Sequence, residues 1–261
     1  MEIKYYHIDA FTSSVFSGNS AGVCILEDVW LPDNIMQKIA FENNLAETAF
    51  IIYQNDKHHI RWFTPSVEVD LCGHATLAAG HIYFTHLGFI KNQISFESRS
   101  GTLHVHRQNN FCILDFPVDS IMQVEISGQM KACFHISPQK VLKGKTDFLF
   151  IYENEDDIRN IEFSLDNIAK LNCRGVIISA PGVGVDFVSR FFAPQSGINE
   201  DPVTGSAHTT LTPYWSSRLN KYDLTARQLS PRGGSLFCRL QGERVLIGGE
   251  SITYKIGAIY I

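Results

Sequence analysis

The sequence predicts an α+β fold built from two pseudo-symmetric halves, each a curved, mostly antiparallel and barrel-like sheet around one central helix. Three observations predict it. Short apolar or alternating stretches bounded by turn residues recur through the 261 residues, a pattern typical of strands. Each half contains one helix with an apolar centre, residues 75–79 in the first half and 211–215 in the second. Finally, motifs of the first half return in the second half in the same order.

The internal repeat is visible in four pairs of motifs. The Arg-led stretch 61–65 (RWFTP) returns 129 residues later as 190–194 (RFFAP), and the helix start Gly73-His74-Ala75 returns 132 residues later as Gly205-Ser206-Ala207. The other two pairs, each 133 residues apart, are 33–35 with 166–168 and 99–103 with 232–236. We therefore predict a first half of residues 1–117, with the last strand at 255–261 as a candidate addition to it, and a second half of residues 118–261.

The apolar pattern also predicts the individual elements. In the first half, strands are expected at about 3–9, 22–27, 49–54, 59–63, 94–98, 102–107 and 111–116, with helices at about 32–41 and 73–86. In the second half, strands are expected at about 147–152, 175–179, 186–192, 235–240, 244–248 and 256–260, with helices at about 165–171 and 205–219.

The composition limits the kind of partner. The net charge is −5 and no block of five like charges occurs, so neither nucleic acid nor an anionic membrane is a predicted partner, whereas a small molecule is. Residues 1–15 carry Glu2, Lys4 and Asp9 where a secretory signal would be apolar. No apolar run approaches the roughly 18 residues of a membrane span. The chain is therefore expected to be cytoplasmic.

Cysteine and histidine spacing predicts no metal site. The six cysteines are scattered and form no Cys-x-x-Cys pair, as expected of reduced thiols. Two histidine pairs, His58 with His59 and His104 with His106, lack a third ligand at a suitable spacing. Exposed strand and turn histidines explain both pairs.

The two repeated helix starts are candidate anion-binding positions. Gly73 and Gly205 allow the backbone to approach a ligand, and the N–H groups that follow lie at the positive end of a helix dipole. A carboxylate or a developing enolate would suit such a position. The alternative is that both glycines serve only tight helix–strand packing, although polar His74 and Ser206 at the matched next position weigh against it.

Two carboxylates stand out because of what surrounds them. Glu47 precedes an apolar run, and its counterpart at the 129-residue offset is Val176, so the second half has no equivalent acid. Desolvation could raise the pKa of such a carboxyl group and make it a general base, while the alternative is a solvated turn residue. Asp201 stands before Pro202, where it could be a helix N-cap, a site residue or both.

Five blocks of the sequence together resemble the phenazine-biosynthesis PhzF-like isomerase family. The resemblance extends over nearly the whole chain, and the last two blocks are the most specific. The blocks are 17–23 (SGNSAGV), 46–50 (AETAF), 61–65 (RWFTP), 71–76 (LCGHAT) and 200–208 (EDPVTGSAH).

The resemblance implies a diaminopimelate epimerase-like fold with the active site in a cleft between the halves, no cofactor and no metal, a small carboxylate-bearing substrate, and a homodimer. By position, Glu47 matches the family's acid/base and acts with His74 and Asp201 as the catalytic set. The residues expected to bind substrate are Asn19, Cys72, Gly73, Ala75, Thr204, Gly205 and Ser206.

A single base suits a proton shift within one face of a substrate, and we expect Glu47 to remove a proton from carbon and return it to another carbon. The main alternative is an amino-acid epimerase. Related epimerases use one thiol from each half, but the counterpart of Cys72 is Thr204, so only a two-base variant with Glu47 and Cys72, or Glu47 and Asp201, stays open. A third alternative is a small-ligand binder without catalysis.

Overall fold

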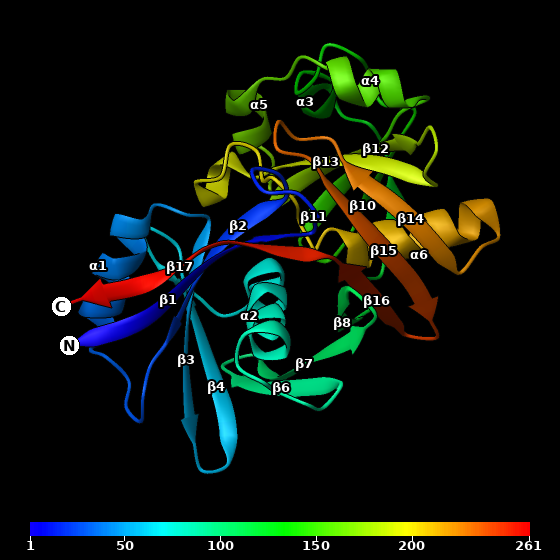
Figure 1. Cartoon of the computed structure of the whole chain (residues 1–261). Helices are drawn as coiled ribbons and strands as arrows, with labels where there is room; N and C mark the ends of the chain where they lie inside the picture. The colour runs from blue at the N-terminus through cyan, green and yellow to red at the C-terminus, as the bar shows by residue number, and fades with distance from the viewer. The chain divides into compact units, whose positions relative to one another are not determined.

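The computed structural model describes all of residues 1–261 and divides them into two compact units (Figure 1). Unit 1 contains Met1–Asp115 and Gly248–Ile261, and unit 2 contains Phe116–Ile247. The chain passes from one unit to the other within β8 (Phe111–Pro117) and returns within β16 (Arg244–Gly249). Strands dominate both units, so the predicted α+β class is confirmed. None of the helices is both long and apolar enough to cross a membrane.

Unit 1 is a curved sheet around α2. The elements in chain order are β1 (Glu2–Ala10), β2 (Asn19–Ile25), α1 (Asp33–Asn43), β3 (Glu47–Gln54), β4 (Lys57–Phe63), β5 (Glu68–Val69), α2 (Gly73–Thr85), β6 (Gln93–Ser98), β7 (Gly101–Gln108), β8 and β17 (Ser251–Tyr260). Strands β2 and β3 run parallel, as do β4 and β6, while the other pairs are antiparallel. The last strand, β17, pairs with β1 along its whole length, so the two chain ends lie side by side (Figure 1).

Helix α2 forms the centre of unit 1 because nearly every side of it is apolar. Ten of its thirteen residues are buried, among them Leu77, Ala78 and Ala79. It packs against β1, β2 and β7 (Figure 1). A side chain at Gly80 would stand 2.5 Å from Val105 of β7, so a glycine is required where helix and strand approach. This packing fixes the position of the helix start at Gly73.

Unit 2 repeats this plan. Its elements are β9 (Met122–Val124), α3 (Gly128–Lys131), β10 (Lys140–Lys143), β11 (Asp147–Ile151), α4 (Glu155–Asn160), α5 (Leu165–Ala169), β12 (Gly175–Pro181), β13 (Phe187–Phe192), η1 (Pro194–Ser196), α6 (His208–Leu219), β14 (Asp223–Gln228), β15 (Gly234–Gln241) and β16. Strands β11 and β12 are parallel and so are β13 and β14, as β2–β3 and β4–β6 are in unit 1. Strand β9 pairs with β10 as β17 pairs with β1.

The structure also corrects several predicted elements. Strand β2 begins at Asn19 rather than at residue 22, which places Asn19 on the sheet. Helix α6 begins at His208, because residues 205–207 form a tighter turn in which the amide of His208 donates to the carbonyl of Gly205. The short strands β5, β9, β10 and β14 and the short helices α3 and α4 were not predicted. Each of them is at most six residues long, whereas periodicity is recognised over a window of roughly 11–18 residues.

An arginine–glutamate pair holds the same loop in both units. In unit 1, Arg61 of β4 donates from Nε and Nη2 to the two oxygens of Glu68, both at 2.7 Å. In unit 2, Arg190 of β13 donates in the same way to Glu200, at 2.7 and 2.9 Å. Each glutamate precedes its glycine, Gly73 or Gly205, by five residues. These two-pronged pairs fix the loop that enters each helix start.

The aromatic residues around the two arginines are repeated as well. The Arg61 guanidinium lies over the rings of Trp30 and Phe63, at 5.4 and 5.2 Å from their centroids. Arg190 lies over Phe163 and Phe192, at 5.3 and 5.1 Å. Phe163 and Phe192 follow their counterparts by 133 and 129 residues, the same offsets as the motifs. The repeated motif therefore serves architecture, with one cation lying over two aromatic rings in each unit.

Candidate active site

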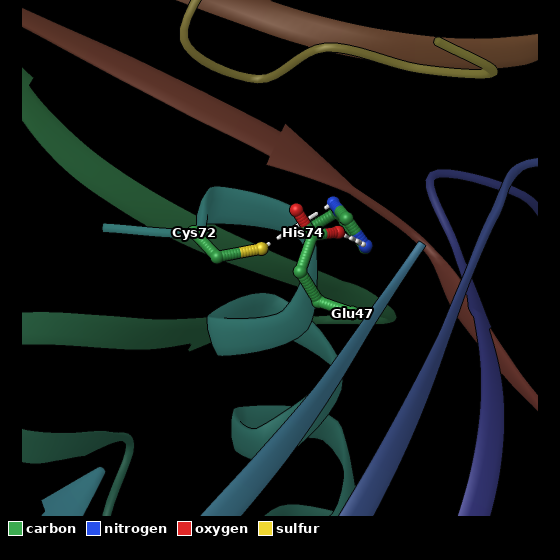
Figure 2. Close-up of side chains that lie close together, drawn as sticks. All are labelled: Glu47, Cys72 and His74. Atoms are coloured by element: carbon green, nitrogen blue, oxygen red, sulfur yellow. Dashed lines mark hydrogen bonds and ion pairs between the residues drawn. The ribbon is translucent and has the colours of Figure 1, made fainter. Parts of the chain in front are cut away.

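The Glu47 cluster, formed by Glu47, Cys72 and His74, lies in unit 1 where β3 and α2 begin (Figure 2). Glu47 is the first residue of β3 and is aligned with Ala21 of the parallel strand β2. Cys72 and His74 flank Gly73 at the start of α2, and both are buried. The carboxylate, thiol and imidazole atoms of the three residues all lie within 4.8 Å of one another.

Glu47 and Cys72 face opposite nitrogens of the His74 ring (Figure 2). Oε2 of Glu47 lies 3.2 Å from Nε2, and Sγ of Cys72 lies 3.6 Å from Nδ1. The Asn19 amide nitrogen, in its assigned orientation, also lies 3.3 Å from Nδ1. Because an amide nitrogen can only donate, Nδ1 is the acceptor and the ring proton is on Nε2. The Nε2–H group therefore faces Glu47.

His74 is neutral near pH 7. Burial lowers its pKa to about 4, and an interaction with the Ser20 backbone acts weakly in the opposite direction. A neutral imidazole can donate one hydrogen bond through Nε2, but that nitrogen makes no well-directed hydrogen bond in this structure. Its nearest anionic neighbour is Oε2 of Glu47 at 3.2 Å, so a substrate group bound beside Glu47 would also lie within reach of this N–H.

The loop before Asn19 is held by Asp9, a residue that the sequence did not single out. Oδ2 of Asp9 accepts from the amide of Phe16 at 2.9 Å, and Oδ1 accepts from the Ser20 hydroxyl at 2.5 Å. Gly18 has a φ of +67°, and a side chain there would stand 2.2 Å from the carbonyl oxygen of Ala10. The glycine and the buried Asp9 together fix the turn that leads into Asn19 and β2.

The Glu47 cluster contains ligand types that bind zinc, but its geometry does not converge on one ion. A metal ion is bound by one nitrogen of an imidazole. Here the thiol approaches Nδ1 and the carboxylate approaches Nε2, so the two groups lie on opposite edges of the ring. This arrangement suits hydrogen bonding and proton transfer along the ring rather than chelation.

In unit 2, Asp201 belongs to a network centred on Gln228. The Thr204 hydroxyl donates to Oδ2 of Asp201 at 2.5 Å. Gln228, at the end of β14 and only 1% exposed, accepts from the amide of Thr204 at 2.9 Å and donates to the carbonyl of Asp201 at 2.8 Å. Because the N-cap of α6 is Ala207, Asp201 lies six residues too early to be that N-cap, and that alternative is wrong.

Ser206 lies beside a cation that the sequence did not reveal. Its hydroxyl oxygen is 3.1 Å from Nη2 of Arg174. Arg174 makes a two-pronged pair with the buried Asp147, with Nε at 2.9 Å from Oδ1. The guanidinium is thus held in place next to the turn that precedes α6. The guanidinium is paired with Asp147, and it adds a fixed hydrogen-bond donor beside Ser206.

The predicted site residues fall into groups that the structure describes separately. Asn19, Cys72 and Gly73 lie with Glu47 and His74 in unit 1, whereas Thr204, Gly205 and Ser206 lie with Asp201 in unit 2. The side chain of Ala75 is fully buried among the core residues of α2, so its substrate contact would have to come from the backbone. That the two groups serve one substrate stays a prediction.

Strand pairing identifies a different counterpart for Glu47. Thr48, the residue after Glu47, pairs with Phe63, the last residue of β4. In unit 2, the last residue of β13, Phe192, pairs with Val176. The counterpart of Glu47 is therefore Gly175, one residue before the predicted Val176. A side chain at Gly175 would stand 2.4 Å from the ring of Phe191. Unit 2 thus has no room for any acid at this position.

Hydrogen bonds support the pairing of Cys72 with Thr204. The Thr76 hydroxyl donates to the carbonyl of Cys72 at 2.5 Å, and Nδ1 of His208 lies 2.8 Å from the carbonyl of Thr204. Thr76 and His208 are 132 residues apart, the same offset as Cys72 and Thr204. Burial lowers the pKa of His208 to about 4, so its neutral ring donates this bond from Nδ1. Unit 2 has a hydroxyl where unit 1 has a thiol.

The family model of phenazine biosynthesis-like proteins matches residues 8–257, almost the whole chain. The chain belongs to this family. An uncharacterized isomerase of Pseudomonas aeruginosa is 48% identical over 259 residues, which cover 99% of both proteins. The crystal structure of a phenazine biosynthesis protein of the PhzF family from Enterococcus faecalis has a TM-score of 0.97 and 42% identity, with 100% of both chains covered. The predicted membership of the PhzF-like family is confirmed.

A more distant structure supports the predicted epimerase-like fold. A hydroxyproline epimerase from Agrobacterium vitis, crystallised with trans-4-hydroxy-L-proline, has a TM-score of 0.63 with 99% of this chain and 92% of that chain covered. Its sequence is only 10% identical, so the similarity concerns the fold alone.

Proposed function

We propose that this family member is an isomerase that moves a proton between carbon atoms of a small carboxylate-bearing substrate, with Glu47 as the single acid/base and without a cofactor. One observation carries the proposal. The Glu47 carboxylate lies 3.2 Å from a neutral, buried His74, whose Nε2–H has no well-directed partner, and unit 2 has no acid at the equivalent position.

Each residue of the cluster has a distinct part in this reaction. The Glu47 carboxylate takes a proton from carbon and becomes a carboxylic acid, while the bonding electrons stay on the substrate as a delocalised anion. His74, being neutral, donates from Nε2 to the developing negative charge rather than transferring a proton. Protonated Glu47 then returns the proton to a second carbon. General acid–base action contributes about 10²–10⁴ in rate, so charge stabilisation must supply much of the rest.

Asp201 and Ser206 are proposed to bind and orient the substrate. Gln228 fixes the backbone on both sides of the Asp201–Thr204 turn, and Arg174 supplies a fixed cation beside Ser206. A substrate carboxylate would suit the Ser206 side, where the guanidinium and the first amides of the turn offer hydrogen-bond donors.

The test is deuterium incorporation at carbon, followed by NMR, when the protein is incubated in deuterated water with cyclic or amino carboxylic acids. We expect incorporation with wild type and with Glu42→Gln, an exposed control on α1, and a loss of about 10²–10⁴-fold with Glu47→Gln. A folded Glu47→Gln protein that exchanges substrate protons as fast as wild type would contradict the proposal. Binding without any exchange would favour a non-catalytic binder.

The second candidate is an epimerase in which Cys72 acts as another base. The thiol lies 3.6 Å from Nδ1 of His74, within the same cluster as Glu47. Two bases on opposite faces of one carbon would invert its configuration. Conversion of one enantiomer into the other, lost on Cys72→Ala, would favour this candidate, whereas a shifted double bond would favour the isomerase.

A further inference from the structure

Unit 1 contains a cavity whose lining does not include the Glu47 cluster. This cavity of about 360 Å³ is walled by the last turns of α2, the β7–β8 hairpin and the beginning of β17. Its volume falls within the range of small-molecule sites. His81, which lines it, lies seven residues beyond His74 on α2, or about 10 Å along the helix. The two sites are therefore at different ends of one helix.

The cavity holds one cation and one anion that do not pair with each other. Arg107 and Glu250 are the charged residues of the lining, since burial lowers the pKa of His81 to about 4 and keeps it neutral. Arg107 donates only to neutral acceptors, the carbonyl of Phe84 and the amide oxygen of Asn92, each at 3.3 Å. The half-buried Glu250 carboxylate makes no ion pair and no hydrogen bond. Both charges are thus available to a ligand.

The lining also includes an apolar wall. Phe84 lies under the Arg107 guanidinium at 5.1 Å, and Phe111 and Ile252 add apolar surface. This apolar surface lies in the same cavity as the two charged side chains.

We propose that this cavity binds a free α-amino acid with an apolar side chain. The ligand carboxylate pairs with Arg107, the ammonium group pairs with Glu250, and the side chain packs against Phe84 and Phe111. A ligand with a single charge would leave either the cation or the anion of the wall without a partner in a partly desolvated space. A zwitterion matches both.

The test is calorimetric titration of the full-length protein with L-phenylalanine. Two analogues each lack one charge, 3-phenylpropanoate and 2-phenylethylamine, and both should bind at least about tenfold more weakly. Glu250→Gln should weaken L-phenylalanine about tenfold, while Glu42→Gln should not change its affinity. Arg107→Met should act like Glu250→Gln, and Glu250→Gln alone suffices if Arg107→Met does not fold.

The same titration with Glu47→Gln distinguishes the cavity from the candidate active site. Affinity for L-phenylalanine within twofold of wild type is expected there, because the cavity does not include Glu47. The proposal is overturned if L-phenylalanine does not bind, if either analogue binds as tightly, if Glu250→Gln leaves the affinity unchanged, or if Glu47→Gln abolishes binding.

Discussion

The helix starts of the two units share their support but differ in their chemistry. Both are preceded by a loop that a two-pronged arginine–glutamate pair holds, Arg61 with Glu68 and Arg190 with Glu200. Beyond this shared frame, unit 1 has a carboxylate, a thiol and an imidazole in contact, whereas unit 2 has a carboxylate fixed by a hydroxyl and a buried amide. The duplicated residues are architectural, and the chemistry is found where the copies differ.

Gly175 shows the physical reason for this difference. The ring of Phe191, on the neighbouring strand β13, occupies the space in which the side chain of an acid would have to lie. In unit 1 the equivalent space admits the Glu47 side chain, which is only 12% exposed. A single base is therefore a consequence of how the two copies pack.

The largest expected effect comes from breaking the shared frame. Arg190→Met leaves Glu200, whose side chain is only 13% exposed, without its partner, which should cost about 3–5 kcal/mol in the free energy of unfolding. Arg61→Met should cost less, because Glu68 keeps a second partner, Arg99, at 2.9 Å. Chemical denaturation of the two variants measures the difference. An equal or larger loss of stability for Arg61→Met would contradict this account of the two arginine–glutamate pairs.

The next effect concerns the imidazole of His74, whose matched residue in unit 2 is Ser206. His74→Gln removes the Nε2–H donor beside Glu47, and turnover should fall by about 10–100-fold, as for loss of a hydrogen bond to a charged group. His106→Gln, on β7 of the same unit, is the matched control and should leave turnover unchanged. Unchanged turnover in a folded His74→Gln protein would show that Nε2 has no part in the reaction.

A smaller effect is expected in the fixed turn of unit 2. Gln228→Leu keeps the side-chain size but leaves the amide of Thr204 and the carbonyl of Asp201 without a partner, which should cost about 1–3 kcal/mol of stability. Gln241→Leu, at an exposed end of β15, should cost little. Equal stabilities of the two variants would mean that Gln228 does not support the turn.

The smallest effect is a change in pH dependence. The folded-state pKa of His208 is about 4, below the ordinary 6.5, so the unfolded chain binds a proton between these pH values that the folded chain does not. The contribution of His208 to the free energy of unfolding is therefore fully present above pH 6.5. It is lost as the pH drops towards 4, by up to about 1 kcal/mol per pH unit. His208→Gln should make the fall shallower, as measured by denaturation at pH 4.5, 5.5 and 7. An unchanged slope would contradict a neutral, buried His208.

The sequence could predict the repeat and the members of the Glu47 cluster, because their motifs are contiguous. It could not locate Gly175 as the counterpart of Glu47, since the offset between the halves changes along the chain and a linear comparison does not show where the extra residue lies. Gln228 and Arg174 also escaped prediction. Their partners, Thr204 and Ser206, are 24 and 32 residues away, and such contacts arise only when the sheet closes.

The central claim is that one carboxylate both removes and returns the proton, and the most direct test is the fate of a label during one turnover. A substrate deuterated at the carbon that loses its proton would be converted in ordinary water with enzyme in excess. Because Glu47 is largely shielded from solvent, we expect a measurable share of the product to carry the substrate's own deuterium at its new carbon. Product with only solvent hydrogen at that carbon would contradict the single-base account.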